Sequence, residues 1–330
     1  MFMSGHDLTA TTAENYRAFA LEAVGRSAQY ERLSTEVADD DPILSFLAGL
    51  PPAKRQPNLL FAAARYLLGA PPELKSLRSL AGDRGHELAA VMRARRTQTN
   101  EPARCATLLP LLGMLPGPLA LIEVGASAGL TLAPDRYSYD YAGHHVQGTD
   151  PDAPVIACEP RGPVPLPGRV PEVSWRAGLD LNPLDVTSDD DMYWLECLIW
   201  PGEEGRLARL RAAIATARRH PPRVFRGDLL TDLPALARQA PADATLVIFH
   251  SAVLAYVDPA RRGEFAAIVA DLGAVWISNE APRVLPAAGG ATLAVPSPYG
   301  NHCFALMRDG RGPVAFTDGH GAWLHWLAAE

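Results

Sequence analysis

Three features that would assign this 330-residue sequence to a specialised class are scarce or missing. It has only four cysteines, none in a Cys-x-x-Cys pair, which disfavours a disulfide scaffold or a zinc site and predicts free thiols in a reducing compartment. No stretch of about 18 consecutive apolar residues occurs, so no spanning helix is expected. The first residues lack the basic start and apolar centre of a signal peptide. We therefore expect a cytoplasmic protein without a membrane partner and without a metal.

Positive charge is also sparse. There are 30 Lys and Arg against 37 Asp and Glu, for a formal net charge of −7. The only basic clusters are short, at residues 93–96 and 218–219, and are typical of solvated helix ends rather than of a nucleic-acid surface. Apolar residues, by contrast, make up 48% of the chain, enough for a large core in one or two domains. A small-molecule ligand is the favoured partner, and the sequence leaves the oligomeric state open.

The sequence pattern changes near residue 115. Residues 7 to about 115 carry apolar side chains at intervals of three and four, without strand alternation, which predicts an all-helical cap or lid domain over residues 1–115. From Leu119 onward, short apolar runs alternate with helical patterns. This alternation predicts an α/β domain over residues 116–330, with a parallel sheet covered on both faces. A Pro- and Gly-rich stretch at 136–171 reads as a loop-rich insertion, and "CFALMRDGRGPVAFTDGH" as a closing antiparallel hairpin.

The first predicted strand runs into the motif Gly-Ala-Ser-Ala-Gly at residues 125–129, which permits two interpretations. It matches the Gly-x-Ser-x-Gly turn of serine hydrolases, with Ser127 as nucleophile and Asp258 and His320 as possible partners. It is equally a glycine-rich turn after a strand, where small residues let a cofactor approach backbone N–H groups at a helix start. The helical pattern before Leu119 and the acidic Glu123 both disfavour the hydrolase, because its nucleophile strand lies mid-sheet and is apolar.

Polar residues also stand at the ends of the later predicted strands. These residues are Asp180, Asp228, His250, and the pair Asn279 and Glu280. In an open α/β sheet, ligands bind beyond the carboxyl ends of the strands. We therefore expect these side chains and the glycine turn to line one cleft.

Two resemblances can be stated from these motifs. "LIEVGASAG", "GLDLNP" and "RGDLLTDLP" resemble motifs of class I S-adenosylmethionine-dependent methyltransferases, over about Leu119 to the C-terminus. The whole chain is also similar to a bacterial family known as domain of unknown function 2332, through "PNLLFAAARYLL", "TQTNE" and "HGAWLHWL". The first resemblance implies a Rossmann-like, seven-stranded methyltransferase-type sheet with an antiparallel last strand, and S-adenosylmethionine as cofactor.

That resemblance also implies roles for individual residues. Asp180 would hold the ribose and Asp228 the adenine, and Leu229 would be a further cofactor-binding residue. The methionine end would lie against Glu123, Gly125, Ser127 and Gly129. Two departures from the pattern are that Ser127 replaces a glycine, and that 55 residues separate Gly125 from Asp180 where about 20 are usual. Asp140 and Asp152 therefore compete with Asp180 for the ribose.

The acceptor side of the expected site is less defined. His250 either takes a proton from the methyl acceptor or is a buried, hydrogen-bonded strand end, and Tyr256 and Glu280 are further candidates. Asn100 and Arg104 either reach the cofactor carboxylate or belong to a helix start with Thr99 or Asn100 as N-cap. The favoured function is methyl transfer to a small molecule. The alternatives are a non-catalytic cofactor-binding protein and a serine hydrolase, and an NAD dehydrogenase is disfavoured because the glycine spacing is wrong.

Overall fold

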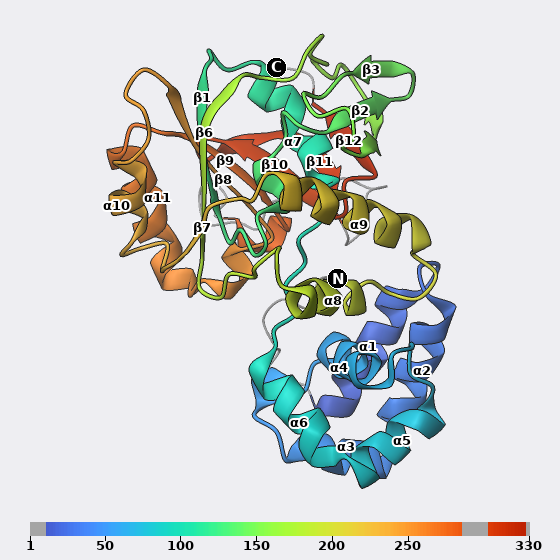
Figure 1. Cartoon of the computed structure of the whole chain (residues 1–330). Helices are drawn as coiled ribbons and strands as arrows, with labels where there is room; N and C mark the ends of the chain where they lie inside the picture. Colours follow the sequence, from blue (N-terminus) through green and yellow to red (C-terminus); the bar gives the residue numbers. More distant parts are fainter. Residues whose placement is uncertain (1–10, 286–302, 328–330) are drawn as a thin grey trace. The chain divides into compact units, whose positions relative to one another are not determined.

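The computed structural model describes residues 11–285 and 303–327, and its contacts divide the chain into two units (Figure 1). The first unit comprises residues 1–99 and 188–208, and the second comprises residues 100–187 and 209–330. Residues 7–10, the start of the expected helical region, lie outside the described part. No helix within the described ranges is long and apolar enough to cross a membrane.

The first unit consists of helices around an aromatic core. Thr11 starts the first of them with a capping box to Glu14, and Gly69 ends α4 in the left-handed conformation at φ 76°. In the core, the Phe61 ring lies 4.8 Å from the Tyr30 ring. The elements are α1 (Thr12–Ala23), α2 (Ala28–Ala38), α3 (Asp41–Ala48), η1 (Pro52–Lys54), α4 (Pro57–Leu68), α5 (Leu74–Asp83), α6 (Gly85–Ala94) and α8 (Asp189–Cys197).

This division differs from the boundary expected near residue 115, because two helices belong to the other unit than expected. α7 (Arg104–Gly113) belongs to the second unit, because its leucines pack against Leu119 and Leu121 of the sheet. α8 comes from the middle of the chain but belongs to the first unit. There, Trp194 Nε1 donates to the Arg96 carbonyl at 2.9 Å. Such contacts between residues far apart in sequence leave no local pattern.

The second unit is built on a nine-stranded sheet with the order β5-β12-β11-β10-β9-β8-β1-β6-β7, rather than the expected seven strands. β1, β6, β7, β8 and β9 are parallel, and β10 and β11 form the expected antiparallel hairpin. The strands are β1 (Leu119–Val124), β5 (Glu159–Arg161), β6 (Val173–Asp180), β7 (Val224–Arg226), β8 (Thr245–Ser251), β9 (Val275–Glu280), β10 (Cys303–Arg308), β11 (Arg311–Asp318) and β12 (Trp323–Trp326).

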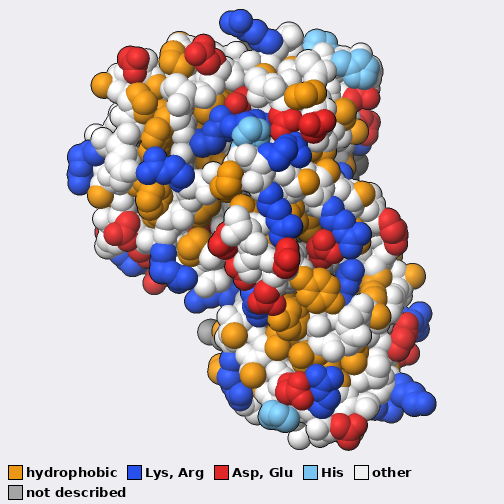
Figure 2. All heavy atoms as spheres, in the orientation of Figure 1, with side chains coloured by type: hydrophobic (Ala, Val, Ile, Leu, Met, Phe, Trp, Pro, Cys, Tyr) orange, Lys and Arg blue, Asp and Glu red, His pale blue; other side chains and the backbone are white. Residues whose placement is uncertain are grey.

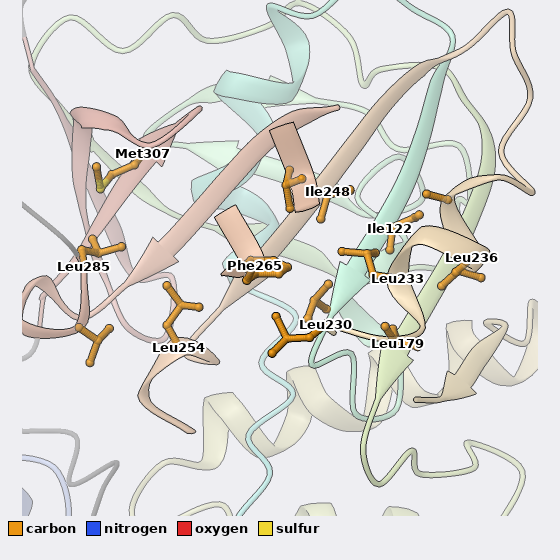
Figure 3. Packing of buried hydrophobic residues seen from close by; sticks show 14 of the residues in the cluster. Ile122, Leu179, Leu230, Leu233, Leu236, Ile248, Leu254, Phe265, Leu285 and Met307 are labelled. Carbon is orange, nitrogen blue, oxygen red and sulfur yellow. The ribbon is translucent and has the colours of Figure 1, made fainter. Parts of the chain in front are cut away.

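Both faces of this sheet are covered, as the continuous apolar runs of its parallel strands require. Ile122 and Ile248 point to the face that carries Leu233 of α10 (Leu233–Ala237) and Phe265 of α11 (Arg262–Asp271), as Figure 3 shows. Alternate residues of the same strands, such as Leu121, point to the opposite face, where α7 lies. α9 (Glu204–Arg219) starts at the end of the first unit and continues into the second.

The insertion at 136–171 is more structured than its Pro and Gly content predicted. β2 (Ser138–Tyr141), β3 (His144–Val146) and β4 (Val155–Ala157) form a separate three-stranded sheet. β5 and β12 then extend the main sheet at one edge, which accounts for the two additional strands. These strands have three or four residues each, and β5 contains Pro160, so no alternation signals them.

The segment after the glycine turn is not the α-helix expected there. A single 3-10 turn, η2 (Leu130–Leu132), follows Gly129. The backbone amide of Leu130, the first residue of this turn, donates to Asn100 Oδ1 at 2.9 Å and is not available to a ligand. The turn therefore offers a ligand fewer backbone donors than a full helix N-terminus would.

Candidate functional site

The order of the parallel strands defines where a ligand would bind. From β1 the chain proceeds outward to β6 and β7, and then returns to the other side of β1 to form β8 and β9. The direction of strand order thus reverses between β1 and β8. Open α/β sheets bind ligands beyond the carboxyl ends of their strands at such a reversal.

The glycine turn lies at this reversal and is held by Asp180. Gly125, Ser127 and Gly129 all adopt left-handed φ values, of 73°, 52° and 72°. The Asp180 carboxylate accepts a hydrogen bond from the Ser127 amide at 2.8 Å and another from the Asn182 amide at 2.7 Å. Despite their separation in sequence, the turn and the acid at the end of β6 are in direct contact. The Asp180 carboxylate stabilises the unusual backbone conformation of Ser127.

The two competing acids lie elsewhere in the fold. Asp140 is in β2 of the small sheet, where its side chain accepts a hydrogen bond from the Gly143 amide at 2.8 Å. Asp152 is an exposed loop residue just before β4. Of the three candidate ribose acids, only Asp180 hydrogen bonds the glycine turn.

Glu123 is a buried carboxyl group at the end of β1. One oxygen, Oε1, hydrogen bonds the hydroxyl of Thr131. The other, Oε2, has no hydrogen-bond partner among the described residues. Burial raises the pKa of Glu123 to about 8, against the opposing effects of the Thr131 hydrogen bond and the positive charge of Arg104.

Arg104 and Asn100 join this site from the segment before the sheet. Arg104 is buried and donates to the carbonyl oxygens of Gly319 at 3.0 Å and Ser251 at 3.2 Å. Asn100 accepts from Leu130, as described above. The expected N-cap role is wrong for Thr99 and Asn100, because α7 begins after Ala103 without a side-chain cap. Asn100 instead fixes the end of the glycine turn, and Arg104 fixes the carboxyl end of β8.

His250 is completely buried, and both of its ring nitrogens are engaged. Trp276 Nε1 donates to His250 Nε2 at 3.0 Å. Because an indole N–H can only donate, the imidazole proton lies on Nδ1, which donates to Glu280 Oε1 at 2.7 Å. The sequence permitted two interpretations of His250, a catalytic base or a buried, hydrogen-bonded residue, and this geometry is the second. In this geometry His250 positions Glu280 and presents no nitrogen to a ligand.

Glu280 in turn holds the loop after β8. Its Oε1 also accepts from the backbone amides of Val253 at 2.7 Å and Leu254 at 3.2 Å. Its Oε2 is buried without a partner among the described residues. The neighbouring Asn279 accepts from Thr317 Oγ1 at 2.8 Å, and its amide group is thus directed into the sheet interface.

Four buried side-chain oxygens at the carboxyl ends of β1, β8 and β9 lack a hydrogen-bond partner within the described chain. An unpaired buried polar group costs about 1–3 kcal/mol, so solvent or a ligand is expected to supply the missing bonds. Ser251 is the member of this group that the sequence did not indicate, because a serine at a strand end carries no pattern. The four atoms are Glu123 Oε2, Ser127 Oγ, Ser251 Oγ and Glu280 Oε2. The buried hydroxyls of Tyr16, Tyr30 and Ser34 in the first unit also lack a partner among the described residues.

Comparison with known families places the whole of this architecture in one family. The profile described as "uncharacterized protein conserved in bacteria (DUF2332)" matches residues 13–326. The chain belongs to the DUF2332 family. This confirms the resemblance drawn from the helical front and the C-terminal segment. No curated protein and no solved structure matches this DUF2332 chain.

The remaining candidates of the DUF2332 chain lie at the ends of β7 and β8. Asp228 is half-buried, and its Oδ1 accepts from the Leu230 amide at 2.8 Å. The preceding Gly227 donates to the Asp180 carbonyl at 3.0 Å, which places Asp228 beside the end of β6. Leu229 is half-buried against the core, and Tyr256 in η3 (Leu254–Tyr256) is exposed.

The parts of a serine hydrolase or metal centre are not assembled in the described ranges. Ser127 Oγ has no hydrogen-bond partner there, so no histidine activates it. Asp258 accepts from the Ala260 amide at 2.9 Å, and the backbone amide of His320 donates to Asp318. No group of three or more potential metal ligands occurs among the described residues. On the face shown in Figure 2, basic and acidic side chains are interspersed rather than gathered in one basic surface.

Proposed function

We propose that this protein binds S-adenosylmethionine at the carboxyl ends of β1 and β8 and transfers its methyl group to a small-molecule acceptor. The observation that carries the proposal is the group of four unpartnered oxygens around the glycine turn, at the reversal of strand order. Membership in the methyltransferase class rests on the resemblance of the motifs at 121–129, 178–183 and 226–234. The nine-stranded sheet and the missing helix after the turn are departures from that class.

The chemistry of the residues fits such a cofactor at each of its polar parts. A methionine ammonium group needs acceptors, and Glu280 Oε2 is an acceptor without a partner among the described residues. Glu123, which is protonated below its pKa of about 8, would accept from the ammonium group after losing its proton, and the positive charge would favour that loss. The methionine carboxylate needs a cation, and Arg104 is a buried arginine whose positive charge acts on Glu123. Asp180 would hold the ribose through the lone pairs that its two backbone bonds leave. Asp228 would accept from the adenine amino group.

Methyl transfer depends mainly on the positioning of the cofactor and the acceptor, and hydrogen bonds within the chain fix the two loops that would position them. The cofactor would supply an electrophilic methyl group. Asp180 fixes the conformation of the glycine turn, while His250 and Glu280 fix the loop at 252–254. Tyr256, exposed on that loop, is the candidate for acceptor contact. Aligned positioning alone is able to supply a large part of the rate enhancement, so a base is not a requirement.

The full engagement of His250 favours a second function for the same site. No imidazole nitrogen faces an acceptor, so for an acceptor that must lose a proton the protein would bind S-adenosylmethionine without turnover. Binding of the cofactor without formation of its demethylated product, over a broad panel of acceptors, would distinguish this function from methyl transfer.

Replacing Asp180 with Ala is expected to weaken S-adenosylmethionine binding by about 10- to 100-fold, because a charge-assisted hydrogen bond contributes roughly 1.5–3 kcal/mol. The affinity of each protein for S-adenosylmethionine would be measured by isothermal titration calorimetry. Asp140→Ala is the matched control, since it removes the same charge from the small sheet and should leave the affinity unchanged. Equal affinities for Asp180→Ala and the unaltered protein would refute the ribose assignment.

A further inference from the structure

A second feature of the sheet unit lies away from the strand ends. A hollow of about 290 Å³, part of it open to solvent, forms between the segment after the glycine turn, the middle of β6 and the end of α9. The enclosed part of the hollow is small, so only a ligand of few atoms would fit inside it. Its lining consists of Gly129, Leu132, Ala133, Arg136, Tyr137, Arg176, Thr216, Ala217, His220 and Pro222.

Arg136 is the unusual residue of this hollow. It is half-buried, and its guanidinium group makes no hydrogen bond or ion pair with any residue that the structure describes. Burial, and then the neighbouring positive charge of Arg176, lowers the pKa of Arg136, against weaker opposing effects of Asp135, Asp150 and Tyr137. A partly desolvated cation without a partner is unfavourable unless a ligand compensates its charge.

The nearby acids do not provide that compensation, because each is held by another cation. Asp135 forms a two-pronged ion pair with Arg176, at 2.7 and 2.8 Å. Asp150 forms an ion pair with Arg219 at 2.8 Å, and His220 Nε2 lies 3.7 Å from the same oxygen. Three arginines, Arg136, Arg176 and Arg219, therefore face two aspartates, which leaves one positive charge for the hollow.

The donors of the other polar side chains are also in use. Tyr137 donates to the Leu130 carbonyl at 2.6 Å, and Thr216 donates to the Ala212 carbonyl at 3.1 Å. The guanidinium of Arg136 is therefore the principal free donor, and its planar fork suits two oxygens of one anion. His220, which directly follows α9, lines the hollow from a different segment of the chain.

We propose that this hollow binds a phosphate group through Arg136, with His220 contacting a further oxygen. A tetrahedral oxyanion offers several oxygens to donors that come from two segments, while a planar carboxylate offers two. The phosphate would be either inorganic or the ester group of a larger molecule. This site adjoins the strand-end cleft, with which it shares Gly129, but the proposal does not depend on S-adenosylmethionine binding.

The test is a titration of the full-length protein, without S-adenosylmethionine, with inorganic phosphate and with phenyl phosphate, at constant ionic strength in chloride. We expect saturable binding in calorimetry and a matching rise in melting temperature with at least one of the two ligands. Binding of both indicates a site for free phosphate, and binding of phenyl phosphate alone indicates a site for an ester. Acetate serves as the planar anion and should bind more weakly.

Variants assign the binding to this hollow. Arg136→Ala should abolish saturation, and Arg136→Lys should keep a weakened response, because it retains the charge but not the fork. Arg169→Ala removes the same charge from an exposed loop position and should bind as the unaltered protein does. The proposal is overturned if neither phosphate compound saturates the unaltered protein, if acetate binds equally well, or if Arg136→Ala, still folded by its melting curve, binds normally.

Discussion

Replacement of Glu123 by Gln should make the protein more stable above pH 8 while leaving its stability near pH 4.5 almost unchanged. Burial raises the pKa of Glu123 from 4.5 to about 8 in the folded protein. Between these values the folded state binds a proton that the unfolded state has lost, so the free energy of unfolding falls as the pH rises. The accumulated loss is on the order of 5 kcal/mol at most. Glutamine is uncharged at every pH and cannot show this loss.

The measurement is urea unfolding of both proteins from pH 4.5 to pH 9. The difference in unfolding free energy should grow through this window and level off above pH 8. Glu172→Gln is the matched control, because it removes an exposed carboxylate just before β6 and should not change the slope. Parallel stability curves for Glu123→Gln and the unaltered protein would show that Glu123 ionises normally, and the account of its burial would be wrong.

Gly125→Ala should destabilise the protein by about 2–5 kcal/mol, combining left-handed backbone strain with overpacking. Gly125 has φ 73°, and an added Cβ would lie 2.3 Å from Cγ2 of Val253. Valine is stiff at χ1 and cannot swing away without a backbone shift. The same substitution should separate the glycine turn from the loop at 252–254. It should therefore weaken the binding of any ligand that contacts both the turn and this loop.

The unfolding free energy in urea measures this effect, with Gly168→Ala as control. Gly168 is exposed, has no atom within 4 Å of an added Cβ and does not need a positive φ. Val253→Ala combined with Gly125→Ala should recover part of the loss by removing the overlapping methyl groups. If Gly125→Ala is as stable as Gly168→Ala, the close approach of the two loops is not a feature of the folded protein.

The parallel strands and the closing hairpin could be predicted because their signal is local. A strand buried on both faces, such as β1, leaves a continuous apolar run, and each run was followed by a polar residue at the sheet edge. The added strands β5 and β12 could not be predicted, because they are very short and depend on partners far away in the sequence. The same holds for α8, whose place with the first unit rests on contacts such as that between Trp194 and Arg96.

The sequence predicted several residues of the candidate site, but not the hydrogen bonds that these residues make. The sequence indicated Glu123, Asp180 and Glu280 at strand ends, and the hydrogen bond from Ser127 to Asp180 shows that two of these strand ends meet. The state of His250 was not predictable, because it depends on Trp276 and Glu280, which lie on the next strand. A serine at a strand end has no distinguishing pattern, so Ser251 appeared only through its unpartnered hydroxyl.

The central claim, that the turn at 125–129 and the loop at 252–254 enclose one nucleoside cofactor, can be tested by amide hydrogen exchange. The exchange of the full-length protein would be measured with and without saturating S-adenosylhomocysteine, the demethylated form of the cofactor. The account predicts slower exchange at residues 125–130 and 252–254, with unchanged exchange in α1–α6. Absence of any protection, or protection confined to segments outside the carboxyl ends of β1, β6, β8 and β9, would contradict it.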